Sequence, residues 1–195
     1  MTILQTPVQE TAQAHRLAPA AGAALALVPL ALCSFSGETG AQITADLAQN
    51  ASRLEAGAAV AAVAAALLVL AAVRLGRRAG STVLTGAGIA VAVLFAAYYA
   101  SFGAGGVVAG MMLDDPGPGV GEGTALLVNM TELARYGVGL AVTVAAVAAR
   151  AALPKPVWLT AAALAVLTAV PFTSWVAALL IPLWLGFSGI VRNDP

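Results

Sequence analysis

Residues 56–73 read AGAAVAAVAAALLVLAAV, a run without any charged side chain, and the basic sequence RLGRR follows at once as residues 74–78. An apolar stretch of about 18 residues or more is typical of a transmembrane helix, which needs about 20 residues to cross a bilayer. Basic residues collect at the cytoplasmic ends of such helices. The stretch therefore predicts a membrane-spanning helix that ends at Arg74 on the cytoplasmic side.

The composition of the whole chain agrees with this prediction. Of 195 residues, 61% are hydrophobic and 9% are charged, whereas soluble domains carry about 25% charged residues. Nine Lys and Arg balance nine Asp and Glu, so no basic excess points to nucleic acid as a partner. The sequence predicts an all-α integral membrane helix bundle that forms a single domain in the lipid bilayer.

Five further apolar runs bring the predicted number of transmembrane helices to six. The last apolar stretch, residues 157–191, would exceed about 50 Å as one helix, so we divide it at a turn near Pro171. We expect the first run to be a retained helix, kinked at Pro29, rather than a cleaved signal peptide. The predicted spans are 17–35, 56–73, 82–112, 124–149, 156–170 and 175–191, and the predicted polar tails are 1–16 and 192–195.

Two segments have further predicted features. Thr39 and Gln42 fit a capping box, which indicates a short helix within residues 36–53 that lies on the membrane surface. The run 82–112 is longer than one crossing requires. Either tilt of the helix or a break around Gly103, Gly105 and Gly106 would accommodate the excess length.

The distribution of basic residues predicts the orientation, because cytoplasmic loops collect Lys and Arg. With both termini in the cytoplasm, only Arg53 lies outside. The inside set has seven members: Arg16, Arg74, Arg77, Arg78, Arg150, Lys155 and Arg192. We therefore predict that both termini lie in the cytoplasm.

Several longer motifs carry a resemblance. They are ITADLAQNASRLEAG (43–57), RLGRR (74–78), LPKPVW (153–158), VPFTSW (170–175) and LLIPLWLGFSG (179–189). In these features the chain resembles an uncharacterised family of small actinobacterial multi-pass membrane proteins. The resemblance implies the topology and a bacterial plasma membrane, and it implies no catalytic residues.

Polar side chains inside the run 124–149 are the most informative for function. Ionisable groups in hydrocarbon cost roughly 2.5–3.5 kcal/mol each, so Glu132 and Arg135 need a reason to be there. They are three residues apart and share one helix face, and Asn129 and Tyr136 extend the same stripe. One interpretation is a site that binds or passes a proton, a cation or a small polar solute; the other is an ion pair that only fixes helix register.

Two tyrosines in the preceding run are possible partners of this stripe. Tyr98 and Tyr99 lie at a similar predicted depth to Glu132, so at most one of them is expected to face Glu132 and hydrogen-bond the charged pair. The alternative is that both belong to the aromatic belt at the membrane interface.

Charged clusters at the ends of the runs have simpler interpretations. A basic cluster is a candidate site for anionic lipid headgroups, although its role in fixing topology already explains it; its members are Arg74, Arg77 and Arg78. Asp114, Asp115 and Glu122 are expected to form an exposed acidic turn, because the loop lacks the alternating oxygen donors of a calcium site.

Small residues predict close helix contacts. Gly106 and Gly110 have the spacing of a GxxxG motif, so a second copy of the chain or another membrane protein is a possible partner through such faces. Cys33 and His15 are single, which leaves no disulfide, metal site or cofactor to expect.

The sequence carries no enzymatic signature, because it contains neither a nucleophile with a base nor a phosphate loop. We expect a non-enzymatic membrane protein of structural, accessory or partner-binding type. The alternative is a transporter or channel subunit for a small solute, proton or cation that uses the intramembrane Glu132 and Arg135.

Overall fold

The computed structural model describes residues 17–111, 118–170 and 172–191. The predicted tails, Pro171 and the loop residues Asp114 and Asp115 lie outside this part. The described residues form helices and no strand, which confirms the all-α prediction. The helices are the segment Leu17–Leu32, which ends in α2 (Val28–Leu32), then α3 (Gly40–Gln49), α4 (Ala51–Ala79), α5 (Thr82–Met111), α6 (Pro118–Ala148), α7 (Lys155–Ala169) and α8 (Ser174–Ser188).

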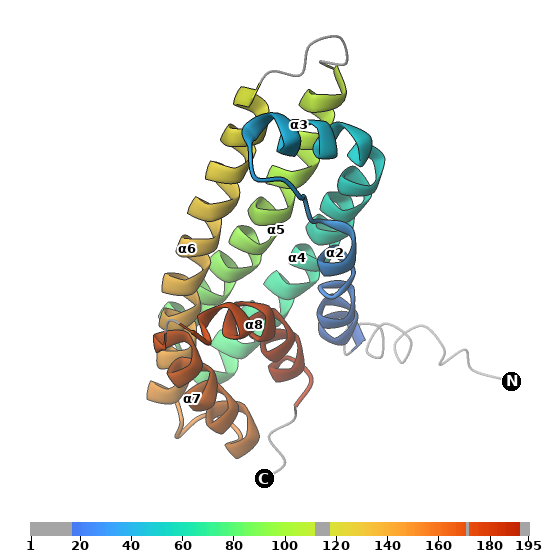
Figure 1. Cartoon of the computed structure of the whole chain (residues 1–195). Coiled ribbons are helices and arrows are strands. Elements are labelled where there is room, and N and C mark those ends of the chain that lie inside the picture. Colours follow the sequence, from blue (N-terminus) through green and yellow to red (C-terminus); the bar gives the residue numbers. More distant parts are fainter. Residues whose placement is uncertain (1–16, 112–117, 171, 192–195) are drawn as a thin grey trace, which may run out of the picture.

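Three long helices form the body of the molecule. Helices α4, α5 and α6 have 29, 30 and 31 residues, or about 45 Å each at roughly 1.5 Å per residue. They run side by side with alternating direction (Figure 1). Among the described residues these three helices are long and apolar enough to cross a membrane.

Small residues let the long helices approach closely. Gly103 and Gly106 of α5 face Ala58 and Ala51 of α4, where an added Cβ would lie 2.8 and 3.1 Å from the neighbouring atoms. Helix α5 is continuous, so the alternative of a break at residues 103–106 is wrong. The glycines serve helix packing instead.

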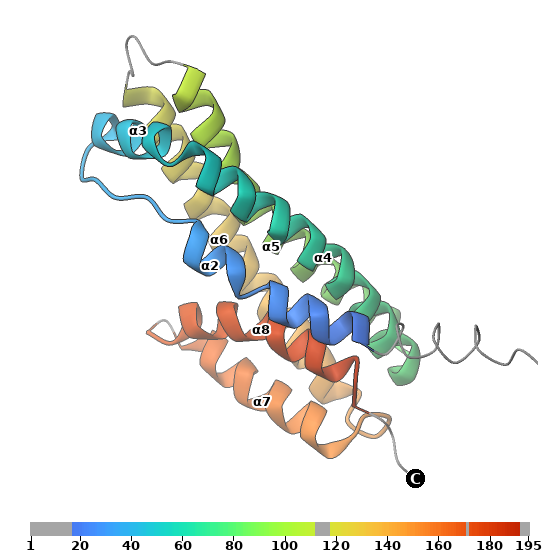
Figure 2. The same cartoon turned by 90° about the vertical axis from the view of Figure 1, so that its right-hand side faces the viewer.

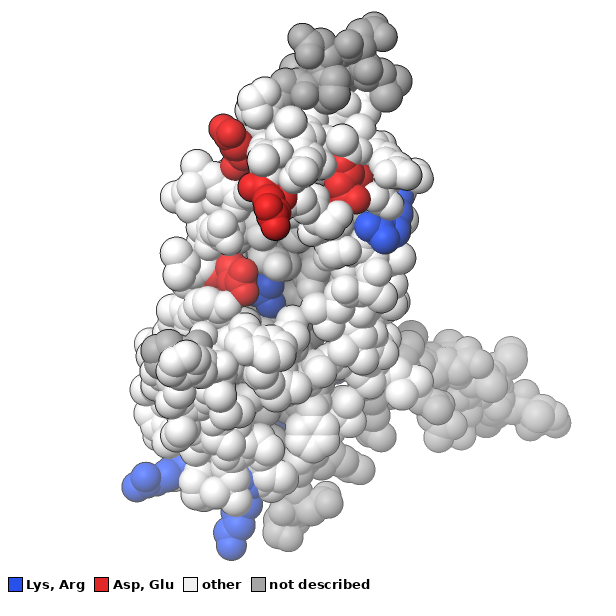
Figure 3. Space-filling view, viewed as in Figure 1, with Lys and Arg blue, Asp and Glu red and all other residues white. Residues whose placement is uncertain are grey.

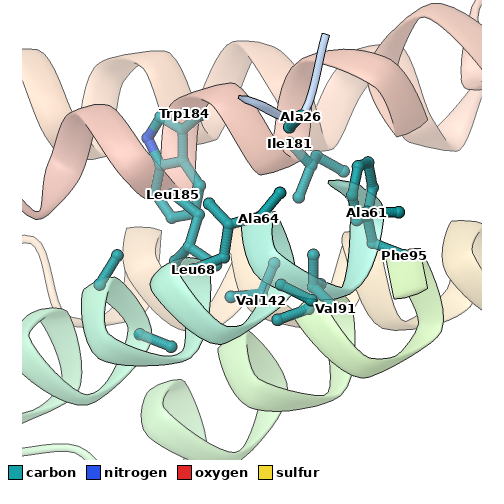
Figure 4. Packing of buried hydrophobic residues seen from close by; sticks show 14 of the residues in the cluster. Ala26, Ala61, Ala64, Leu68, Val91, Phe95, Val142, Ile181, Trp184 and Leu185 are labelled. Atoms are coloured by element: carbon teal, nitrogen blue, oxygen red, sulfur yellow. The ribbon is translucent and has the colours of Figure 1, made fainter. Parts of the chain in front are cut away.

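The core continues from α4 into α8. Figure 4 shows alanine and leucine side chains of α4 facing the apolar side chains of α8. Ala61, Ala64 and Leu68 are fully buried in one cluster with Ile181 and Leu185. The abundant alanines therefore allow α8 to pack directly against the long helices.

The remaining apolar helices are shorter. The segment Leu17–Leu32 is interrupted by a turn at Ala26 and Leu27, just before Pro29, as the predicted kink requires. Helices α7 and α8 have 15 residues each and lie beside one half of the long helices only (Figures 1 and 2). The predicted helices are thus present, but only three reach the length of a full span.

Helix α3 lies across one end of the bundle (Figure 1). The predicted capping box is confirmed, since Thr39 accepts from the Gln42 backbone while the Gln42 side chain accepts from the Thr39 backbone. Thr44 then joins α3 to α6, because its hydroxyl accepts the backbone N–H of Gly121 at 2.9 Å. This contact closes the end of the bundle.

Charged residues mark the two ends differently (Figure 3). At the end with α3, which we name the acidic end, the described charged residues are Glu38, Asp46, Arg53, Glu55 and Glu122. At the opposite end, which we name the basic end, they are Arg74, Arg77, Arg78, Arg150 and Lys155. An acidic and a basic side chain also meet partway along the bundle, beside a hollow.

Candidate functional site

Arg135, near the middle of α6, is buried with only 7% of its surface exposed. Its guanidinium donates to the backbone carbonyl of Ala178 in α8 at 2.9 Å, and this hydrogen bond is itself buried. A hydrogen bond from a charged donor is stronger than a neutral one. Arg135 therefore ties α6 to α8 in the interior of the protein.

The carbonyl of Ala178 lacks its usual helical hydrogen-bond donor because of Pro182. A helical carbonyl normally accepts the N–H four residues later, and for Ala178 that residue is Pro182, which has no N–H. A buried carbonyl without a partner would cost about 1–3 kcal/mol. Arg135 supplies the donor that Pro182 removes, so the arginine has a structural role.

Aromatic rings of α5 surround the guanidinium. Its carbon lies 4.6 Å from the ring centroid of Tyr98 and 5.9 Å from that of Phe95, within the range of cation–π attraction. Tyr98 therefore meets the site through its ring face rather than through the predicted hydrogen bond to the charged pair.

Glu132 has a different partner from Arg135. Its carboxylate accepts a hydrogen bond from the Tyr136 hydroxyl at 2.5 Å, and its side chain is half-buried. Among the contacts of the described residues, none is an ion pair between Glu132 and Arg135. The predicted ion pair is therefore not among these contacts, although an acidic and a basic side chain lie next to each other partway along the bundle (Figure 3).

The other two predicted site residues take contrasting positions. Tyr99 is buried, packs edge-on against Phe95 and Tyr98, and its hydroxyl has no hydrogen-bond partner among the described residues. Asn129 is exposed on the surface of α6. Tyr99 thus belongs to the core, whereas Asn129 lies on an exposed face of α6.

Burial changes along one face of α6. Glu122, Asn129, Tyr136 and Thr143 follow each other at intervals of seven residues, which is close to two helical turns, so they share a face. Glu122 and Asn129 are exposed, Tyr136 is half-buried and Thr143 is fully buried. Helices α7 and α8 pack on the basic half of α6, so the polar stripe is uncovered only toward the acidic end.

Arg78 is a second arginine with a structural role, and the sequence did not predict this role. Its guanidinium donates to the carbonyls of Ser188 at 3.2 Å and Val191 at 2.6 Å, at the end of α8. A cation there satisfies unpaired carbonyls and complements the helix dipole. Of the predicted lipid-binding arginines, Arg77 is exposed, Arg74 is half-buried and Arg78 is held by α8.

The contact between Arg135 and Ala178 could have been anticipated in part from the sequence. Pro182 within a helical run predicts an unpaired carbonyl at Ala178. A buried arginine in another helix is a suitable donor for that carbonyl. The pairing of this donor with this acceptor needs the fold, because the two residues are 43 positions apart.

Other sites for chemistry are not apparent in the described part. No group of three or more His, Cys, Asp or Glu there is placed to hold a metal ion. A groove of about 380 Å³ between α7 and α8 is lined almost entirely by apolar side chains, among them Leu164, Leu183 and Trp184. Thr160 contributes its only hydroxyl, which is bonded to its own helix.

Comparison with known proteins finds no relative from which a role could be transferred. No family model, curated protein or solved structure matches the chain. The resemblance to small actinobacterial membrane proteins therefore stays a prediction, and function has to be argued from the contacts described above.

Proposed function

We propose that the protein is a multi-pass integral protein of a bacterial plasma membrane, with both termini and the basic end in the cytoplasm. The length and apolar character of α4, α5 and α6 support insertion. The separation of charges between the acidic and basic ends supports the orientation. The lipid bilayer is then its principal partner.

We further propose that the protein is non-enzymatic and acts as a structural, accessory or partner-binding subunit. The observation that carries this proposal is the contact of Arg135 with Ala178. The most buried charged group of the described bundle is engaged in holding two helices together, whereas a catalytic group would face a substrate cleft. Partners are expected at the small-residue faces of the helices, either a second copy or another membrane protein.

A second candidate function, as a transporter or channel subunit for protons or small cations, rests on Glu132. Its carboxylate is half-buried and bonded to a neutral phenol rather than to a cation. An unpaired carboxylate inside the membrane is expensive and is often functional. This observation gives the second candidate its only support.

Flux measurements separate the two candidates. The purified protein is placed in liposomes with an internal pH dye, and proton flux is followed after a potential is imposed. For an accessory subunit, wild type and Glu132→Gln leak at the rate of protein-free liposomes. A pH-dependent flux that Glu132→Gln abolishes would replace the first candidate by the second.

A further inference from the structure

The position of α8 is fixed at both of its ends by arginines. Arg78 binds its last carbonyls at the basic end, and Arg135 binds Ala178, near its start, from the middle of α6. Helix α7 begins at Lys155, also at the basic end. Each helix spans about 22 Å at roughly 1.5 Å per residue, which is less than the roughly 30 Å of a bilayer core.

The turn between α7 and α8 suits an environment without water. Thr173 donates its hydroxyl to the carbonyl of Leu167 at 2.8 Å, and the Trp175 indole donates to the carbonyl of Phe172 at 3.1 Å. Residues 170–176 contain no charge, and Phe172 is 89% exposed. Side chains of the turn thus satisfy its own carbonyls, as lipid requires, while an apolar ring points outward.

We propose that α7 and α8 form a re-entrant hairpin, which enters and leaves the membrane at the basic end and turns near the midplane. Beside the hairpin, between it and α3, a water-filled recess along α6 opens toward the acidic end and admits small cations to Glu132, whereas the turn itself faces lipid. The proposal rests on the membrane insertion proposed above. It replaces the fifth and sixth predicted crossings by one hairpin, and both termini remain on the cytoplasmic side.

The recess follows from what the hairpin leaves uncovered. Asn129 and Glu132 lie on α6 between Gly121, which contacts α3, and Arg135, which contacts α8 near its start. Tyr136 follows Arg135, at the level of the hairpin. A polar stripe of this kind is unfavourable against lipid, and water removes that penalty. The acidic end, toward which the recess opens, carries Glu38, Asp46, Glu55 and Glu122 against one described basic residue, Arg53, and its negative field concentrates cations.

The number of carboxylates in the recess indicates which cations it could bind. Glu132 is its one described carboxylate at depth, and no cluster of three ligating side chains lies among the described residues. A multidentate divalent-cation site is therefore not built there. Hydronium and monovalent cations need only one carboxylate and water, so they are the ligands that the recess fits.

Cysteine labelling tests the depth of the hairpin. In a Cys33→Ala background, Phe172→Cys is compared with Gly119→Cys at the acidic end and Lys155→Cys at the basic end. A membrane-impermeant maleimide is applied to intact cells and to inverted vesicles. Gly119→Cys is expected to react only in cells and Lys155→Cys only in vesicles, whereas Phe172→Cys reacts in neither and reacts fully after SDS.

The two controls keep the outcomes distinct. If both controls react from the same side, the proposed membrane orientation fails. If the controls behave as expected and Phe172→Cys reacts from outside like Gly119→Cys, two full crossings exist and the re-entrant hairpin is refuted.

Charged thiol reagents test the recess. Asn129→Cys in intact cells is expected to react with a small trimethylammonium methanethiosulfonate at least about threefold faster than with a sulfonate reagent of similar size, because Glu132 lies one turn away. Adding Glu132→Gln should remove most of this preference. Failure of Asn129→Cys to react, or an equal preference with and without Glu132, would overturn the proposal by showing that lipid or a partner helix fills the space.

Discussion

The basic and acidic halves of the bundle use their interior polar groups in opposite ways. In the basic half, Arg78 and Arg135 each donate to backbone carbonyls of α8. In the acidic half, Asn129 is exposed and Glu132 bonds only to Tyr136. The two arginines hold helices together, whereas Glu132 makes no such contact with another helix.

The difference teaches that an ionisable residue inside an apolar helix is not sufficient to define a functional site. Arg135 and Glu132 are neighbours on α6, yet the arginine compensates a proline and the glutamate does not compensate anything in the described contacts. A role in binding a cation is therefore to be sought at Glu132 rather than at Arg135.

The strongest test of this comparison is removal of the interior cation. Arg135→Met keeps much of the side-chain volume but leaves the Ala178 carbonyl buried without a donor, which should lower the free energy of unfolding by about 2 kcal/mol. Unfolding in mixed detergent micelles with increasing SDS measures the change.

A double mutant isolates the proposed cause. Pro182→Ala restores the N–H that pairs with Ala178, so Arg135→Met should cost about 1 kcal/mol less in that background. Equal costs in both backgrounds would mean that the arginine acts through its aromatic contacts rather than through the carbonyl.

A smaller effect is expected at the basic end. Arg78→Gln weakens the contacts with the end of α8 and should lower the free energy of unfolding by about 1 kcal/mol. Arg77→Gln is the matched control, because Arg77 is exposed on the same turn and should change stability by less than about 0.5 kcal/mol. Similar losses for both variants would contradict a specific role for Arg78.

The smallest effect on stability is expected in the acidic half. Glu132→Gln keeps an oxygen that accepts from Tyr136, so the free energy of unfolding should stay within about 0.5 kcal/mol of wild type. A loss close to that of Arg135→Met would show that the carboxylate is structural after all and would remove the contrast between the halves.

Much of the fold could be predicted from local patterns. Apolar runs gave the helices, and Thr39 with Gln42 gave the start of α3, because periodicity and capping depend on neighbouring residues. The length of the last apolar stretch and the turn signal at Pro171 separated α7 from α8 but did not predict how they pack. Their packing depends on contacts between distant residues, such as Arg78 with Ser188.

The sequence singled out the residues of the candidate site but did not predict their hydrogen-bond partners. Intramembrane charge singled out Glu132 and Arg135, and helical spacing suggested that they pair. The structure directs them to Tyr136 and Ala178 instead. Helical spacing places two residues near each other, whereas the neighbouring helix decides which way a long side chain turns.

Reactivity along one face of α6 tests the contrast between the halves most directly. Single cysteines at Glu122, Asn129, Tyr136 and Thr143, each in a Cys33→Ala background, are exposed to a small water-soluble thiol reagent in intact cells. We predict fast reaction at 122 and 129, slower reaction at 136 and none at 143. Uniform protection from 129 to 143 would contradict the account, because it would place the whole stripe against lipid or protein.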